Sequence, residues 1–312
     1  MRYGLWVLAW VIRWRPQWVY ASDPFSCPIV LLLAAGLGLK VLYHEHDPPD
    51  STEKRRSWFV KGVSAARGAL ARRAALCLFP NEDRLRRFVK ETGRTGETLL
   101  VWNCPSKGEA GPPRDPLTKD TLTLFYHGSI VPSRLPRVLL EALRSLPASV
   151  ELRVAGYSTV GHSDYAKQFQ QWAGELGVAD RVKFIGVVPI RHDLLEQTRR
   201  CDVGVALMPT LSGDFGERTM AGASNKPFDY LACGLALLVS DLPDWKKAYG
   251  VPGYGLLCDP ADPQSIAEAI RWFLERPDQM RAMGEKGRRR ILSDWNYETQ
   301  FKAVLPFLEG AR

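Results

Sequence analysis

A lysine at the predicted start of a helix is the residue best suited to chemistry on a phosphorylated ligand. Lys226 follows Ser224 and Asn225, either of which suits a helix N-cap. Gly234 suits a left-handed helix end, and 235–239 is a short apolar run typical of a buried parallel strand. A helix start offers free N–H groups and the positive end of the helix dipole, and Lys226 adds a full charge. The segment therefore predicts a phosphate site, with an ordinary capped surface helix as the alternative.

A second group of polar residues follows the predicted strand 40–44. The carboxyl ends of parallel strands are where open α/β sheets bind ligands. His44 and His46 share one face if the strand continues, which makes a metal pair one hypothesis. No third ligand stands at a recognisable spacing, so we expect no metal. Ser22 and Asp23 end the neighbouring strand and are candidates for the same cleft, with a plain turn as the alternative.

Signals for strands and helices alternate along the chain, and the elements that they predict would position these residues. An apolar helix is predicted over 4–14, and its tryptophans at a spacing of four predict core packing. Four strands follow, at 18–21, 40–44, 75–79 and 99–102. Six more are predicted at 122–126, 150–155, 182–185, 203–207, 235–239 and 255–258. Strands separated by helices predict an α/β fold with two Rossmann-like doubly wound domains, the first of them incomplete.

The predicted domain boundaries follow from composition. Residues 1–104 form the partial first domain, and the Pro- and Gly-rich segment 105–119 is the linker. Residues 120–292 form the second domain, which ends in helices over 263–276 and 278–292. The last segment, 293–312, is predicted to be a helix, and the family resemblance described next implies that it crosses back to the first domain.

The string Ser-Asn-Lys-Pro-Phe-Asp-Tyr-Leu-Ala-Cys-Gly over 224–234 resembles the donor-site helix of glycosyltransferase family 4. The family pattern is Pro-Asn-Lys-x-x-Glu-Tyr-x-Ala-x-Gly. The resemblance implies a GT-B fold, a nucleotide-sugar donor, retention of anomeric configuration and no metal or other cofactor. It also implies sugar transfer to a glycan or lipid-linked acceptor, in the synthesis of cell-surface polysaccharides or glycoconjugates.

The resemblance extends to the loop 127–134, His-Gly-Ser-Ile-Val-Pro-Ser-Arg, which matches the family's Gly-Arg-Leu-x-x-x-Lys. Gly128 would let the backbone approach the ligand. Arg134 falls on the Lys position and would meet the donor diphosphate, with an exposed arginine at a helix start as the alternative. Ser129 falls where the family has Arg, so one of two expected cations is missing.

The helix itself would supply Asn225 and Lys226 to the donor. Asp229 matches the second acidic residue of the family's Glu-x7-Glu motif and would suit the ribose hydroxyls, with a solvent-facing helix residue as the alternative. The first acidic position is Ala221, which removes the usual contact to a sugar hydroxyl. Carboxylates in the loop 212–217 are candidates to replace it.

In the first domain, His46-Asp47 resembles the family's His-Asp, whose histidine lies near the reacting sugar and the acceptor. The predicted catalytic residues are therefore His46, Arg134 and Lys226. The predicted acceptor side comprises Ser22, Asp23, His44 and Asp47.

Two other functions remain open from the sequence. A sugar-nucleotide-binding module without turnover is favoured by Ser129, by Ala221 and by the short first domain. A sugar-nucleotide epimerase on the same fold ranks lower, because the Asn-Lys-x-x-Asp-Tyr string belongs to the transferase pattern.

The small number of strands in the first domain suggests that the chain pairs with another protein segment. Strand-and-loop units that precede 18–24 in the family are absent, which predicts a bare sheet edge at 18–21 and a helix 4–14 that loses cover. We expect either an N-terminally shortened reading frame or a chain that pairs at 18–21 with a protein partner or with itself.

Charge and composition indicate whether the protein binds a membrane or nucleic acid. The chain has 312 residues, a net charge of +8 and no apolar run of membrane-spanning length. Residues 54–94 carry twelve basic residues against three acidic ones, which predicts a solvated basic face or contact with an anionic membrane. No nucleic-acid fold signature accompanies this charge, so nucleic acid is not expected. Six scattered cysteines without a C-x-x-C pair predict free thiols and a cytoplasmic protein, peripheral on the inner membrane face if lipid is bound.

Overall fold

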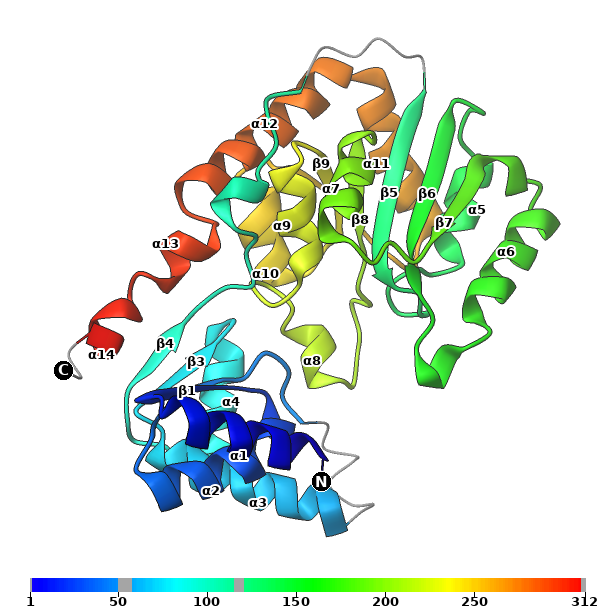
Figure 1. The fold of residues 1–312 in the computed structure, drawn as a ribbon. Helices are drawn as coiled ribbons and strands as arrows, with labels where there is room; N and C mark the ends of the chain where they lie inside the picture. The colour runs from blue at the N-terminus through cyan, green and yellow to red at the C-terminus, as the bar shows by residue number, and fades with distance from the viewer. Residues whose placement is uncertain (1, 50–57, 115–120, 310–312) are drawn as a thin grey trace. The chain divides into compact units, whose positions relative to one another are not determined.

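A computed structural model describes residues 2–49, 58–114 and 121–309 (Figure 1). The chain divides into two compact units, one of residues 1–103 with 300–312 and one of residues 104–299. Both units are layered α/β structures with parallel sheets, so the predicted fold class is confirmed. Within the described residues, no helix is both long and apolar enough to cross a membrane.

The sheet of the first unit has four parallel strands in chain order. They are β1 (Trp18–Ser22), β2 (Lys40–His44), β3 (Leu76–Phe79) and β4 (Thr98–Leu100). The helices of the unit are α1 (Arg2–Trp14), η1 (Pro24–Ser26), α2 (Cys27–Leu37), α3 (Trp58–Arg73) and α4 (Glu82–Thr92). Each α-helix packs on the next in chain order, from α1 to α4. Right-handed crossovers put such a row of helices on one face of the sheet, as Figure 1 shows.

Alternation along the strands divides the first unit into two cores. Val41 and Tyr43 of β2 face the helices, whereas Leu42 faces the opposite side and packs with Val304 near the C-terminus. The C-terminal segment was predicted as one helix, but it forms α13 (Tyr297–Phe301) and α14 (Leu305–Glu309). Pro306 explains the break, because proline is tolerated in the first turn of a helix and disrupts its interior.

The sheet of the second unit has six parallel strands in the order β10-β9-β8-β5-β6-β7. They are β5 (Leu122–Ser129), β6 (Val150–Tyr157), β7 (Val182–Gly186), β8 (Val203–Ala206), β9 (Ala236–Ser240) and β10 (Gly255–Cys258). The order reverses between β5 and β8, which is the switch point where doubly wound sheets bind ligands. The six strands predicted for this domain are therefore present.

Helices cover both faces of the second sheet. The longer ones are α5 (Val138–Arg144), α6 (Tyr165–Glu175), α7 (Arg191–Arg199), α9 (Asn225–Ala232), α11 (Pro263–Glu275) and α12 (Pro277–Ser293). Short pieces include α8 (Phe215–Arg218) and α10 (Pro243–Trp245). Helix α5 packs on α11 and helix α9 packs on α12. The six cysteines are free, as predicted, and five of them are buried.

The prediction that the α1 tryptophans pack in a core is wrong. Trp6, Trp10 and Trp14 are 60%, 37% and 69% exposed, and their rings contact one another along the helix. The reason is the position of α1 at the end of the helix row. Among the described residues, β1 has a strand partner on one side only, so no strand covers the outer flank of α1.

Candidate functional site

Helix α9 begins where the sequence predicts, at Asn225, with Ser224 as the N-cap residue. The Ser224 side chain makes no capping hydrogen bond, so it does not occupy the N–H groups of the first turn, to which Pro227 contributes none. Asn225 is exposed, whereas Lys226 is only 8% exposed. Gly234 ends the segment at a φ of 72°, as expected for a left-handed turn. A helix start without a side-chain cap is a suitable position for an anion.

The loop after β5 lies against this helix start. Gly128 has a φ of 112°, and a Cβ atom built there would lie 3.1 Å from Cε of Lys226. The ammonium of Lys226 stands 5.5 Å from the ring centroid of Tyr126 on the same strand. The two segments assigned to the donor diphosphate are thus in contact in the folded unit.

We predict that Gly128→Ala weakens binding of a nucleoside diphosphate. Alanine at this positive φ costs about 1–3 kcal/mol and must also displace Lys226, so the affinity should fall about tenfold. Calorimetric titration with a nucleoside diphosphate measures this affinity. Gly161→Ala is the matched control, because its Cβ meets nothing within 4 Å and its backbone needs no positive φ. Equal affinities of the two variants would contradict the placement of this loop.

Burial makes the ammonium group of Lys226 easier to deprotonate. Desolvation, with repulsion from Arg134, lowers its pKa to about 7. The neighbouring His127 is buried, and burial together with Lys226 and Arg191 lowers its pKa to about 3, so it is neutral near pH 7. An incoming diphosphate would restore the charge on Lys226, because a nearby anion favours the ammonium form.

Arg134, the second predicted cation, is half-buried in the loop that follows β5. Its Nη1 donates to Oγ of Ser129 at 3.3 Å. Ser129 therefore positions Arg134 in this structure, although it cannot supply the positive charge of the arginine found at its position in the family. The alternative of a solvated, unconstrained arginine is not what the structure shows.

Asp229 does not face solvent, so the alternative we gave for this residue is wrong. It is 2% exposed and accepts from Arg191 Nη2 at 2.8 Å and from Arg191 Nη1 at 3.3 Å. Nε2 of His127 lies 3.4 Å from Oδ2 of Asp229, the oxygen that also accepts from Arg191 Nη1. Burial raises the pKa of Asp229, against the lowering effect of Arg191. Its ribose role stays a prediction, and it requires Arg191 to release the carboxylate.

Tyr230 fixes α9 to the sheet. Its hydroxyl accepts from N of His127 at 3.1 Å and donates to O of Val205 at 3.1 Å, which ties the helix to β5 and β8. Its ring lies over Gly204, where an added Cβ would come within 2.1 Å of Cγ. The position of the helix start is therefore set by the two central strands at the switch point.

In the first unit, His46 is held in place by two neighbours. Its Nδ1 lies 3.0 Å from Oδ1 of Asn103, and its backbone N donates to Oδ1 of Asp23 at 2.8 Å. The same carboxylate oxygen accepts from N of Asp47 at 3.2 Å. Asp23 adopts a φ of 60°, an uncommon conformation for a residue other than glycine. Asp23 thus shapes the loop that presents His46, and neighbouring Ser22 donates to Asp23 Oδ2 at 3.3 Å.

His44 requires a correction, because it does not line an open acceptor cleft. It is 1% exposed, and its ring lies against that of His46 with centroids 3.8 Å apart. Nδ1 of His44 lies 2.6 Å from the hydroxyl of Tyr20. Burial lowers the pKa of His44 to about 3, so it supports His46 as a neutral ring. Asp47 is exposed and pairs with Arg84 Nη1 at 2.9 Å.

Sequence reasoning missed two residues that lie next to Asp229, namely Arg191 and His127. Arg191, at the start of α7, bridges Asp229 and Glu109, and no local motif marks it. His127 stands directly before Gly128, so its position next to the donor loop was a usable signal. In the described part of the chain, no three His, Cys, Asp or Glu side chains are grouped to hold a metal ion.

Residues 112–290 match the family model described as Glycosyl transferases group 1, which is more than half of the chain. The chain belongs to this family. The match includes both donor segments, the loop 127–134 and the helix α9.

Curated relatives carry transferase names. The D-inositol 3-phosphate glycosyltransferase of Streptomyces griseus subsp. griseus is 29% identical over 217 residues, 65% of this chain and 42% of that protein. The GDP-mannose-dependent alpha-(1-6)-phosphatidylinositol monomannoside mannosyltransferase of Mycobacterium tuberculosis is 25% identical over 193 residues, 60% of this chain and 47% of that protein. The group 1 chain thus spans less than half the length of these relatives.

Solved structures share the fold. Anabaena Alr3699/HepE, in complex with UDP, has a TM-score of 0.75 at 17% identity, covering 98% of this chain and 82% of that one. Sucrose-phosphate synthase from Thermosynechococcus elongatus has a TM-score of 0.73 at 18% identity, covering 99% of this chain and 78% of that one. The α/β fold with Rossmann-like parallel sheets therefore matches that of GT-B glycosyltransferases.

Proposed function

We propose that this group 1 chain transfers a sugar from a nucleoside diphosphate sugar to a glycan or lipid-linked acceptor. The observation that carries the proposal is the contact between the β5 loop and the α9 start, where Gly128 leaves room for Lys226. Both segments lie in the region matched to the family. Retention of configuration and membership of family 4 follow from the resemblance.

The donor diphosphate would be bound by three kinds of positive group in the second unit. The N–H groups at the α9 start would meet one phosphate, and Lys226 and Arg134 would add charge. These groups stabilise the departing diphosphate most when its charge builds up, so they would favour the transition state over the bound donor. Asp229 would take the ribose once Arg191 turns to Glu109, its other partner.

The acceptor side rests on the first unit. His46 is partly exposed, and its backbone is fixed by Asp23, so it would be placed to contact the transferred sugar or the acceptor hydroxyl. The relatives named above are called inositol phosphate and phosphatidylinositol mannoside transferases. A polyol or lipid-linked acceptor is therefore the class to test first.

His46→Ala should remove transfer while leaving donor binding intact. We expect the rate of sugar transfer to fall at least a hundredfold, because a group positioned at the reacting centre contributes about 10²–10⁴-fold. Product formation from UDP-glucose or GDP-mannose measures the rate, and calorimetry measures donor affinity. His162→Ala, an exposed histidine of the second unit, is the control. Loss of affinity for the nucleoside diphosphate alone in His46→Ala would contradict its assignment to the acceptor side.

The rival function, binding without turnover, has two observations in its favour. Ser129 stands where the family has an arginine, so one cation is missing. The Asp229 carboxylate is already bonded to Arg191. Purified protein that binds nucleoside diphosphate sugars without hydrolysing or transferring them would support it. Unchanged nucleotide affinity in Arg134→Ala with Lys226→Ala would reject both functions, since both require this diphosphate site.

A further inference from the structure

The helix layer of the first unit carries an exposed apolar surface. Eleven of the 22 exposed large apolar side chains in the described residues lie on α1, α2, η1 and the start of α3. They are Tyr3, Leu5, Trp6, Trp10, Ile12, Trp14, Phe25, Leu32, Leu37, Trp58 and Phe59. We call this set the aromatic face. Exposed apolar patches of this extent mark interaction sites on soluble proteins.

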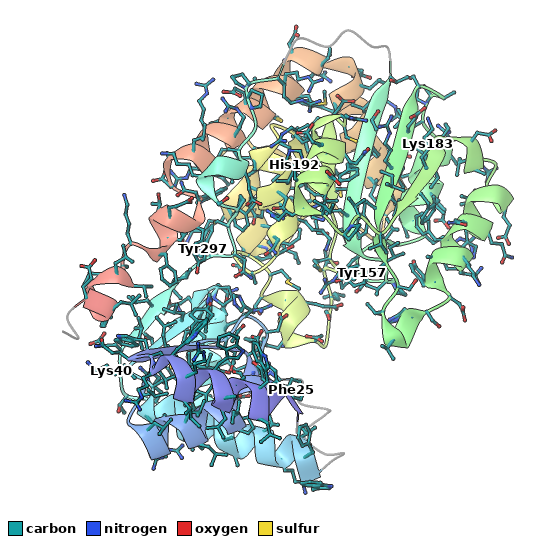
Figure 2. All side chains as sticks on the ribbon, in the orientation of Figure 1. Phe25, Lys40, Tyr157, Lys183, His192 and Tyr297 are labelled. Atoms are coloured by element: carbon teal, nitrogen blue, oxygen red, sulfur yellow. The ribbon has the colours of Figure 1, made fainter. Side chains whose placement is uncertain are left out.

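The aromatic face extends across neighbouring helices. On α1, Gly4 lies against Ile29 of α2, and Val11 is the buried residue of the helix. The tryptophan rings form a row along α1, with centroids 6.0 Å and then 4.3 Å apart. Phe25, labelled in Figure 2, stacks on Phe59 with centroids 6.4 Å apart, and Trp58 lies beside it. The face therefore belongs to the outside of the helix layer as well as to the sheet edge.

The first unit, which carries the aromatic face, also carries the excess positive charge of the chain. The first unit has 18 Lys and Arg against 10 Asp and Glu, and the second has 24 of each, so the whole excess of +8 belongs to the first unit. No acidic residue precedes Asp23 in the sequence. Tryptophan and tyrosine prefer the headgroup region of bilayers, and basic residues add attraction to anionic lipid.

We propose that the aromatic face docks on an anionic lipid surface. A peptide strand added at the β1 edge would extend the sheet, whereas the exposed Leu32 and Leu37 lie on α2 in the helix layer. A second copy would bring two basic units together at the cost of charge repulsion. A lipid interface fits both the breadth of the face and its charge. This inference is independent of the sugar-transfer chemistry and extends the membrane contact predicted for 54–94 to α1, η1 and α2.

The test is co-sedimentation of the full chain with vesicles. We expect binding to equimolar phosphatidylglycerol and phosphatidylcholine, and at least tenfold weaker binding to phosphatidylcholine alone. Replacing Trp6, Trp10 and Trp14 with serine should reduce binding to the anionic vesicles at least tenfold. The matched control replaces Val160, Leu211 and Val251 of the second unit, which are 104%, 93% and 78% exposed, and should bind like the parent.

Three results would overturn the proposal. One is equal vesicle binding by the tryptophan variant and its control, and another is equal binding to neutral and anionic vesicles. The third is a parent chain that is dimeric by light scattering and fails to bind vesicles, whereas the tryptophan variant is monomeric. That result would assign the aromatic face to a second copy. Near-ultraviolet circular dichroism of both variants checks that each is folded.

Discussion

Replacing Lys226 with methionine should abolish measurable binding of a nucleoside diphosphate sugar while making the folded protein more stable. The side chain is 8% exposed, and burial lowers its pKa from 10.5 to about 7. Burial in the folded protein therefore disfavours the ammonium form of Lys226, which is the form that binds the diphosphate. We expect affinity to fall at least a hundredfold, in line with the loss of a buried charged donor.

The pH dependence of stability in this prediction has a definite sign. Below pH 7 Lys226 is protonated in both states, so the folded state bears the full cost of a buried charge. Between pH 7 and 10.5 the unfolded chain binds more protons at this position, so its contribution to stability rises with pH. Methionine removes the cost, which should raise the free energy of unfolding on the order of 2–4 kcal/mol at pH 6 and by little at pH 10.

Urea unfolding at the two pH values measures the stability, and titration with donor measures the affinity. Lys247→Met, at an exposed lysine, is the control and should change neither. Donor affinity of the parent should weaken as the pH rises above about 7, because binding favours the charged form. A Lys226→Met protein that is less stable at pH 6 than the parent would contradict the buried-charge argument.

Arg67→Met should destabilise the first unit by about 3–5 kcal/mol, the cost of leaving one partner of a buried ion pair alone. The guanidinium donates to both carboxylate oxygens of Glu45, at 2.5 and 2.6 Å, and both side chains are at most 4% exposed. It also reaches Glu91 at 2.9 Å and lies 4.7 Å from the ring centroid of Phe88. Without Arg67, the partner that the described residues leave to the Glu45 carboxylate is the hydroxyl of Tyr43 at 2.7 Å.

Urea titration followed by circular dichroism measures this loss. The matched control is Arg86→Met on α4, whose side chain is 69% exposed and whose partners lie 3.5 and 3.9 Å away, so it should cost less than about 1 kcal/mol. Replacing both Glu45 and Arg67 with methionine should recover most of the stability. Similar stability in Arg67→Met and Arg86→Met would show that the buried pair contributes little.

Periodicity predicted most of the fold because most strands contain a short apolar run bounded by turn residues. Strands such as β2 and β9 are buried on both faces, which gives a continuous apolar run and clear ends. The strand predicted at 99–102 lies at 98–100 instead, since its pairing with β3 runs from Thr98 to Leu100. The local sequence does not encode that register.

The candidate site was predictable only where it lies in a local motif. The segments around Gly128 and Lys226 each resemble a family pattern, and the structure brings them together. The Arg191–Asp229 pair joins residues 38 positions apart and leaves no local signal. Burial of His44 and exposure of Trp6 depend on which strands and helices lie beside them, and a single sequence does not specify those neighbours.

The close approach of Tyr230 to Gly204 restricts how this protein can diverge. A methyl group at position 204 would overlap the tyrosine ring, so a larger residue there can be accepted only after the ring at 230 has been lost. Losing the ring also removes the hydroxyl shared by two strands. The two positions should therefore change together or stay fixed together, and related chains that keep Tyr at one should keep Gly at the other.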